Sequence, residues 1–407
     1  MYHGDFMNDE EQRGLERRFI QLYFWVYWLQ SLNGTWLNLY LNQVTGYSKT
    51  QIGILSSIFM MSGVLLTPMI GLRFDVSRRR PAFLAGLALL AGFAFCLYAF
   101  PVPWPVLIPV AVAFACGWMP LVPLMDTIAN LEHVKGATKY GYGGYRRWGT
   151  IGFAVAGPAA GLLTTDGRLW AVFPAYLACA AAVAWFAYSI PAHQAADPGE
   201  AASRIMRVPN PSDVLELLRL PNFRRFLAVV LLASVGSSAC YTFRSIYLSS
   251  IGLSNRTIGM LWLLIIPGEF VCFTWAARWM KRWGTGPLVM FGLAVAGLRW
   301  ILLSFSRPPW LYAVEVLHGI GFAVYFPAAV AFVQAEAPPR LRGTAQVLFF
   351  SVASGIGSAI GAAVAGRMAD VFGMQQVLVF GGGLQVAGGV LQVLLVRHRP
   401  AEARQAA

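Results

Sequence analysis

The sequence has few charged residues for its length. Asp, Glu, Lys and Arg make up 12% of the 407 residues, whereas a soluble globular domain carries about 25%. Hydrophobic residues make up 57% and the mean hydropathy is +0.58. This composition excludes an ordinary soluble domain and indicates a chain that lies in a lipid bilayer. We therefore do not expect nucleic acid as a partner despite the net charge of +13.

Cysteine and histidine are also scarce, with 5 residues of each. The cysteines fall inside long apolar runs at unrelated spacings, and all histidines except His318 fall in tails or loops. The sequence contains no Walker loop, HExxH, GxSxG or paired-cysteine motif. We therefore expect neither an enzyme nor a bound metal or cofactor.

Twelve apolar runs of about 20 residues follow one another, and each can cross a bilayer as a helix. They occupy residues 18–42, 50–72, 81–100, 104–131, 145–165, 169–190, 222–249, 257–277, 286–306, 309–333, 341–366 and 374–396. Most basic residues lie in the N-terminus, the even-numbered loops and the C-terminal tail, which predicts that both termini are cytoplasmic. The odd-numbered loops carry only Lys49, Arg168, Arg256, Arg307 and Arg367.

The two halves of the chain repeat each other. The segment YLNQVTGYSKTQIGIL from Tyr40 recurs as YLSSIGLSNRTIGML from Tyr247, about half the chain later. We predict an all-α polytopic membrane protein with two six-helix pseudo-repeats, which is the architecture of major facilitator transporters. The predicted segments are an N-terminal bundle at 1–190, a cytoplasmic linker at 191–221, a C-terminal bundle at 222–396 and a cytoplasmic tail at 397–407.

One predicted hairpin carries charge inside the membrane. PLVPLMDTIAN, from Pro120, contains Asp126, and YGGYRRWGTIGF, from Tyr142, contains Arg146. Intramembrane charges are costly, so they indicate function or mutual neutralisation. We leave open whether Asp126 and Arg146 form a structural ion pair or contact substrate.

This hairpin resembles the YGxxRxWGSIGF-type signature of the phenylpropionate permease and nucleoside–proton symporter branch of the major facilitator superfamily. The resemblance implies a proton-coupled symporter of a small organic solute that works by alternating access in the bacterial inner membrane. The segment GLRFDVSRRR also resembles the superfamily's cytoplasmic loop motif. That second resemblance implies a gating role for Gly71 and Asp75.

The first run is rich in aromatic and amide groups. Tyr27 and Gln30 share one helical face with Tyr23, and Asn33 lies mid-span. This face can stack on an aromatic substrate and line its cavity. Anchoring of the aromatic rings at the membrane interface is the alternative.

Four charged or titratable residues lie inside the second half. Glu269, Arg299, Glu315 and His318 come from three consecutive runs, and Glu315 and His318 share a face. Burial favours the protonated form of a carboxyl, a nearby guanidinium favours the ionised form, and histidine can relay a proton. We therefore predict a proton-coupling set in which Glu269 or Glu315 accepts the proton. We interpret Arg244, near the outer end of the seventh run, as snorkelling to the membrane surface.

The set is similar to that of the lactose permease, which also has an arginine on the ninth helix and a His–acid pair on the tenth. The order of the pair differs, because here Glu315 precedes His318.

The function is predicted as proton symport, with an aromatic acid favoured as substrate and a nucleoside or sugar as alternatives. Gly157-Pro158-x-x-Gly161 resembles part of the signature of drug–proton antiporters, so efflux stays open as a second function. A membrane-embedded enzyme and a receptor without flux are weaker alternatives. The expected partners are the small solute, protons and the bilayer. We expect a monomer, because a twelve-helix transporter encloses its own site.

Overall fold

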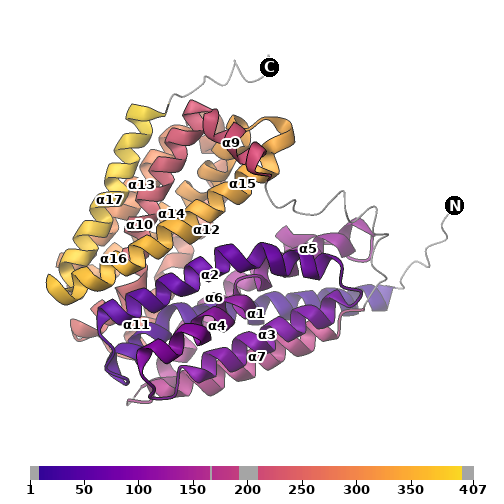
Figure 1. Cartoon of the computed structure of the whole chain (residues 1–407), viewed down its shortest axis with the longest axis horizontal. Helices are drawn as coiled ribbons and strands as arrows, with labels where there is room; N and C mark the ends of the chain where they lie inside the picture. The colour runs from indigo at the N-terminus through magenta and orange to yellow at the C-terminus, as the bar shows by residue number, and fades with distance from the viewer. Residues whose placement is uncertain (1–8, 166, 192–209, 397–407) are drawn as a thin grey trace. The chain divides into compact units, whose positions relative to one another are not determined.

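A computed structural model describes residues 9–165, 167–191 and 210–396, and every regular element in these ranges is a helix (Figure 1). Much of the predicted linker and the whole predicted tail lie outside the described residues. The first half of the chain contains α1 (Asp9–Gln43), α2 (Lys49–Asp75), α3 (Arg80–Leu97), η1 (Trp104–Val106), α4 (Leu107–Trp118), α5 (Leu121–Val134), α6 (Tyr142–Leu163), η2 (Leu169–Ala171) and α7 (Val172–Tyr188).

The second half begins with a short amphipathic helix and continues with long ones. Its elements are α9 (Pro211–Arg219), α10 (Pro221–Ser250), α11 (Asn255–Met260), η3 (Leu261–Leu264), α12 (Ile265–Trp283), α13 (Thr285–Phe305), α14 (Trp310–Glu336), η4 (Pro339–Leu341), α15 (Arg342–Phe350), a π-helical turn η5 (Ser351–Ile356), α16 (Gly357–Val371) and α17 (Met374–Leu395).

Among the described residues, 10 helical stretches are long and apolar enough to cross a membrane. They correspond to ten of the twelve predicted runs; the other two runs form α1 and α6. Both of these helices are long, but amide, Tyr and Trp residues lower the hydropathy of α1. Two arginines and several glycines lower that of α6. The all-helical, polytopic prediction is confirmed, and the orientation of the termini remains a prediction.

The chain divides into two compact units. Unit 1 comprises Met1–Thr45, Leu65–Met206 and Asn255–Gly259, and unit 2 comprises Gly46–Val64, Arg207–Ser254 and Met260–Ala407. Each unit therefore combines most of one half of the sequence with a short segment from the other. The first part of α2 belongs to unit 2 and its last part to unit 1.

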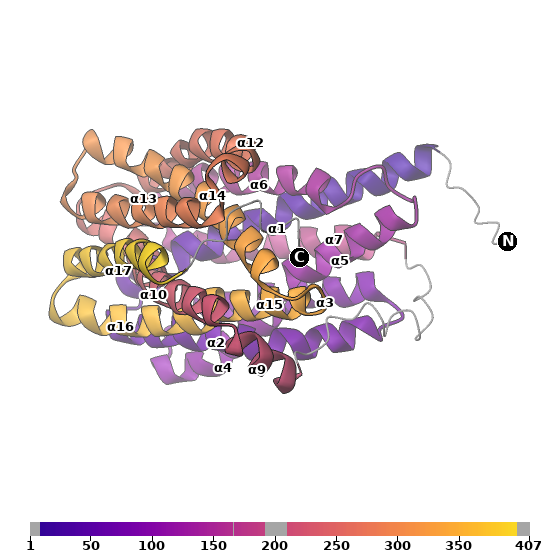
Figure 2. The same ribbon diagram turned by 90° about the horizontal axis from the view of Figure 1, so that it is seen from above.

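Small residues hold unit 2 together. Figure 2 shows α17 lying between α13 and α10. A Cβ at Gly382 would lie 2.5 Å from the carbonyl oxygen of Gly297 on α13, and one at Gly381 would lie 2.5 Å from that of Gly236 on α10. Both neighbours of α17 therefore approach its backbone directly. Such contacts stabilise pairs of membrane helices through close van der Waals packing. Inside lipid the hydrophobic effect does not drive helices together, so association depends on this packing.

We predict that Gly382→Ala destabilises the protein whereas Gly383→Ala does not. The added methyl at Gly382 clashes with α13, and overpacking of this kind costs about 1–3 kcal/mol. A Cβ at Gly383 meets nothing within 4 Å, so this neighbour is a matched control. Thermal unfolding of the two variants in detergent measures the difference. Equal midpoints for both would show that α13 and α17 do not approach as described.

Candidate functional site

A buried carboxylate shared by two guanidinium groups lies in unit 2. Glu315 Oε1 accepts hydrogen bonds from Arg244 Nε at 3.2 Å and Nη2 at 2.9 Å, and Glu315 Oε2 accepts one from Arg299 Nη1 at 2.7 Å. The exposed fractions of these side chains are 0% for Glu315, 3% for Arg244 and 1% for Arg299. Three charged groups are thus removed from water, and one carboxylate is shared between two cations.

Close helix packing brings the three side chains together. Arg244 lies on α10, Arg299 on α13 and Glu315 on α14. A Cβ at Gly292 of α13 would lie 2.6 Å from the backbone nitrogen of Tyr325 on α14. Because the two backbones nearly touch, the long Arg299 side chain can reach Glu315 without leaving the interior of the unit.

Aromatic rings cover both guanidinium groups. Arg299 lies over the ring of Trp300 at 3.7 Å, and Arg244 lies over the ring of Trp262 at 4.6 Å. Tyr241 is also close, with its ring centroid 5.8 Å from Arg299. Desolvated cation–π contacts contribute about 2 kcal/mol, and arginine suits such sites because its planar group is weakly hydrated. The rings therefore offset part of the lost hydration of the cations.

His318 joins the same site one turn along α14. Its ring nitrogen Nδ1 lies 3.1 Å from the hydroxyl of Tyr241, and its ring meets that of Trp262 edge to face. Glu269 lies on α12 beside this turn, since a Cβ at Gly319 would lie 2.7 Å from the Glu269 backbone nitrogen. The structure thus gathers the four residues of the predicted proton-coupling set in unit 2.

The site also has an unused donor. Arg299 Nη2 is buried without a hydrogen-bond partner in the described structure. Glu315 already accepts from both arginines, so it cannot fully satisfy either of them. Loss of the negative charge on Glu315 would leave two adjacent cations in a desolvated setting, where charge repulsion is strong. The site can therefore respond to a proton or to an added anion.

The interpretation of Arg244 as a snorkelling residue is wrong. Its side chain points inward and pairs with Glu315 instead of reaching the surface. Counting residues from the helix ends, which gives the depth of each side chain in the membrane, would have indicated the pair. At about 1.5 Å per residue, Arg244 lies roughly 9 Å from the end of α10 and Glu315 roughly 8 Å from the start of α14, at the same membrane face.

Tyrosine side chains of α1 engage the charged residues of unit 1. Tyr23 donates its hydroxyl to Asp126 Oδ1 at 2.5 Å, and Arg146 lies over the ring of Tyr27 at 4.0 Å. Gly149, one turn beyond Arg146, leaves room for the Tyr27 ring because any Cβ there would overlap it. Asp126 and Arg146 thus both lie against α1, close enough for their charges to interact.

Other predicted site residues have different surroundings. On α1, Gln30 is exposed and Asn33 half-buried. The backbone oxygen of Asp75 accepts a hydrogen bond from Arg80 Nη2 at 2.8 Å. A Cβ at Gly71 would meet nothing within 4 Å, so close helix approach does not explain glycine at this position.

Metal binding finds no support in the described ranges. No group of three or more His, Cys, Asp or Glu side chains there could hold a metal ion, and the five cysteines are free.

Comparison with known proteins identifies the family. Residues 18–380 match the MFS_1 like family. The chain belongs to this family of the major facilitator superfamily. It is therefore a multi-pass membrane transporter and not an enzyme.

Individual relatives agree with this assignment. The probable 3-phenylpropionic acid transporter of Escherichia coli (strain K12) is 30% identical over 87% of this chain and 88% of its own. The maltose permease of Geobacillus stearothermophilus is 24% identical over 89% of this chain and 90% of its own. The crystal structure of the nucleoside transporter NupG superposes with a TM-score of 0.81 at 17% identity, covering 97% of this chain and 100% of that one. The last likeness shows the major facilitator fold.

We predict that Arg244→Ala destabilises the protein by about 2 kcal/mol or more, because hydrogen bonds to charged groups contribute about 1.5–3 kcal/mol each and those of Arg244 are buried. Arg340→Ala is the matched control. Arg340 pairs with Glu216 on the surface, with 62% of its side chain exposed, and such pairs contribute about 0–1 kcal/mol. Thermal unfolding in detergent compares the two variants. A loss no larger for Arg244→Ala would contradict the buried pairing.

Proposed function

We propose that the chain is a proton-coupled symporter of a small organic anion, with an aromatic carboxylate as the favoured substrate. The observation that carries this proposal is the single Glu315 carboxylate shared by Arg244 and Arg299 in a sealed, aromatic setting. We further propose that the transporter lies in a bacterial inner membrane and works as a monomer, because a twelve-helix transporter encloses its own site.

The shared carboxylate links a proton to an anion. When Glu315 is protonated, Arg244 and Arg299 lose the charge that balances them. A substrate carboxylate can then replace the missing charge, so each ligand improves the binding of the other. Linkage of this kind is reciprocal. This linkage couples the proton flux to the substrate flux only if neither ligand crosses the membrane readily alone. The free-energy cost of leaving a buried charge uncompensated disfavours crossing with a single ligand.

The remaining residues of the set handle the proton. The ring of His318 lies on the same face of α14 as Glu315, and its contact with Tyr241 connects it to a hydroxyl that can exchange a proton. Glu269 lies beside the same turn and is the second candidate for the proton acceptor.

In unit 1, Arg146 and the Tyr27 ring form a pair that can contact the carboxylate or ring of a substrate.

An aromatic acid suits the chemistry of the site. Two arginines can hold a carboxylate in a forked geometry, and Trp262 and Tyr241 offer rings beside them. The relative that is named for 3-phenylpropionic acid supports this class. A neutral nucleoside or sugar is the second candidate, favoured by the relatives named for maltose and nucleosides. With a neutral substrate, Glu315 would keep its role as the counter-charge of both arginines.

Uptake into proteoliposomes tests the proposal. We expect 3-phenylpropionate to accumulate faster than in protein-free liposomes, which the undissociated acid also enters, and only when the vesicle interior is alkaline. Uridine and maltose should stay near equilibrium. One proton with one monovalent anion carries no net charge, so clamping the membrane potential with valinomycin should not change the accumulation. Accumulation of uridine or maltose would select the neutral class. Expulsion of a cationic dye without any uptake would replace symport by antiport.

We predict that Glu315→Gln abolishes accumulation against a gradient but retains exchange of labelled for unlabelled substrate. The amide keeps the shape of the side chain and cannot cycle a proton. Retained exchange also demonstrates that the variant is folded and binds substrate. Glu269→Gln is tested in parallel to identify the proton acceptor. Only substitution of the acceptor should abolish accumulation and retain exchange. Wild-type accumulation by Glu315→Gln would remove Glu315 from coupling.

A further inference from the structure

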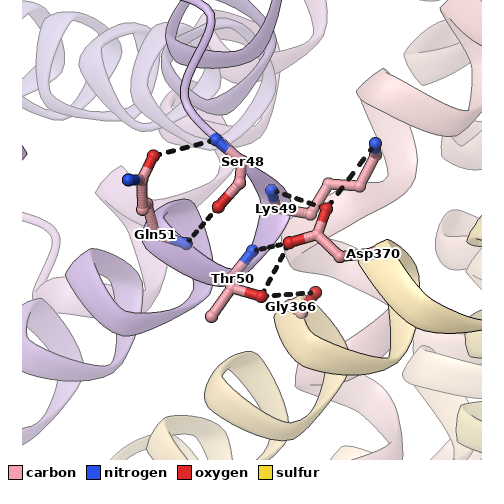
Figure 3. Close-up of polar contacts among 6 residues, drawn as sticks. All are labelled: Ser48, Lys49, Thr50, Gln51, Gly366 and Asp370. Carbon is pink, nitrogen blue, oxygen red and sulfur yellow. Dashed lines mark hydrogen bonds and ion pairs between the residues drawn. The ribbon is translucent and has the colours of Figure 1, made fainter.

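The N-terminus of α2 is capped by a side chain from a helix far away in sequence (Figure 3). Asp370 Oδ2 accepts hydrogen bonds from the Thr50 backbone N–H at 2.8 Å and from Thr50 Oγ1 at 2.6 Å. Asp370 Oδ1 accepts one from the Lys49 backbone N–H at 3.2 Å, and Lys49 Nζ lies 3.8 Å away. The carboxylate on α16 thus lies at the positive end of the α2 dipole, where negative charge is stabilising.

Helix α2 also has a cap of its own. Ser48 Oγ accepts from the Gln51 backbone N–H at 3.2 Å, and Gln51 Oε1 accepts from the Ser48 backbone N–H at 2.9 Å (Figure 3). This reciprocal pair is a capping box, which satisfies the first turn locally. Helix formation therefore does not require Asp370. The contact of Asp370 instead holds α2 against α16.

Below the cap, the two helices lie against each other over several turns. A Cβ at Gly366 would lie 2.5 Å from the carbonyl oxygen of Lys49, so no other side chain fits there. Further along, Ser57 Oγ donates to the Ala359 carbonyl oxygen at 2.5 Å. The cap is therefore the end of a continuous contact between the first part of α2 and α16, all within unit 2.

The repeated segment makes a related contact in unit 1 without the charge. Asn255, which begins α11 as Lys49 begins α2, donates from Nδ2 to the Thr164 carbonyl oxygen at 2.8 Å. A Cβ at Gly161 of α6 would lie 2.8 Å from the Asn255 carbonyl oxygen. The glycine contact is thus common to both repeats. In unit 2 a carboxylate is added to it.

We propose that Asp370 is a positioning residue of the transport cycle: it holds α2 on α16 in one conformational state and releases it in another. Thr50 comes from the first sequence repeat and Asp370 from the second, and alternating access moves such repeats against each other. The exposed side-chain fractions are 24% for Asp370 and 30% for Lys49, so water can solvate both groups after release. This inference depends on the transporter family alone and not on the substrate or on proton coupling.

Thiol labelling tests the proposal. Ser57→Cys places a reporter inside the contact, and the rate of its reaction with N-ethylmaleimide in proteoliposomes measures how often α2 leaves α16. Protein without the reporter gives the background from the native cysteines. We expect Asp370→Ala to raise the rate on the order of tenfold, as for loss of a strong helix cap. Lys49→Ala should change it less than about twofold, because its ion pair is long and partly exposed.

A second variant reaches the same contact from the glycine side. Gly366→Ala should also raise labelling of the reporter, because its methyl pushes α2 away while Asp370 keeps its charge. Gly86→Ala is the matched control, since a Cβ at this exposed position meets nothing within 4 Å. Ser304→Cys, buried elsewhere in unit 2, is the control reporter for general loosening.

The outcomes separate the proposal from its alternatives. Faster labelling at Ser57→Cys in both variants, with Ser304→Cys unchanged, supports a releasable contact. Unchanged labelling at Ser57→Cys in both would overturn it, and so would equal increases at both reporters, which indicate a purely structural role. An effect of Lys49→Ala as large as that of Asp370→Ala would assign the contact to the ion pair instead of the cap. If Asp370→Ala is not monodisperse in detergent, Gly366→Ala decides the test.

Discussion

The arrangement of unit 2 depends on one buried carboxylate that is shared between two cations. Glu315 has no access to water, and neither Arg244 nor Arg299 has more than a trace of it. Loss of Glu315 would leave two buried cations without a counter-charge, which is strongly destabilising. Loss of either arginine would leave one Arg–Glu pair with fewer buried hydrogen bonds. Since the three side chains come from α10, α13 and α14, this charge balance sets how these helices are rotated about their axes.

Charge balance of this kind requires helices that approach closely. Glycines along α13, α14 and α17 remove the side chains that would otherwise keep the backbones apart, and the arginines cross the short remaining distance. Trp262 and Trp300 then cover the guanidinium groups. At this site glycine and tryptophan thus act together, because the glycines let the helices approach and the two tryptophans cover the guanidinium groups.

The sequence contained enough information for the class of protein, the helices and the repeat, and it singled out Glu315, Arg299 and His318, which lie close together in unit 2. Their role in proton coupling remains a prediction. The spacing of Glu315 and His318 identified a shared face because helical periodicity alone determines it. Partners across helices were harder to predict. The sequence of an almost uniformly apolar helix does not show which side of the helix faces the protein interior. The sequence therefore could not distinguish an Arg244 that points inward from one that snorkels outward. On α1, amide and aromatic residues are mixed along the helix, and the sequence likewise did not reveal the contact of Tyr23 with Asp126, or that Gln30 is exposed while Tyr27 is buried.

The Glu315 group and the Asp370 group of unit 2 differ in burial, and this difference separates their possible roles. The Glu315 group is sealed, so its charge balance can change only by a chemical event such as the arrival of a proton or an anion. The Asp370 group is partly exposed, so it can break and reform against water with little change in solvation. A sealed group is suited to sense ligands, and an exposed group is suited to hold and release helices. A transporter needs both properties, and one ion pair cannot supply both. Desolvation makes a buried ion pair sensitive to ligands, but the same desolvation would prevent that pair from opening to water.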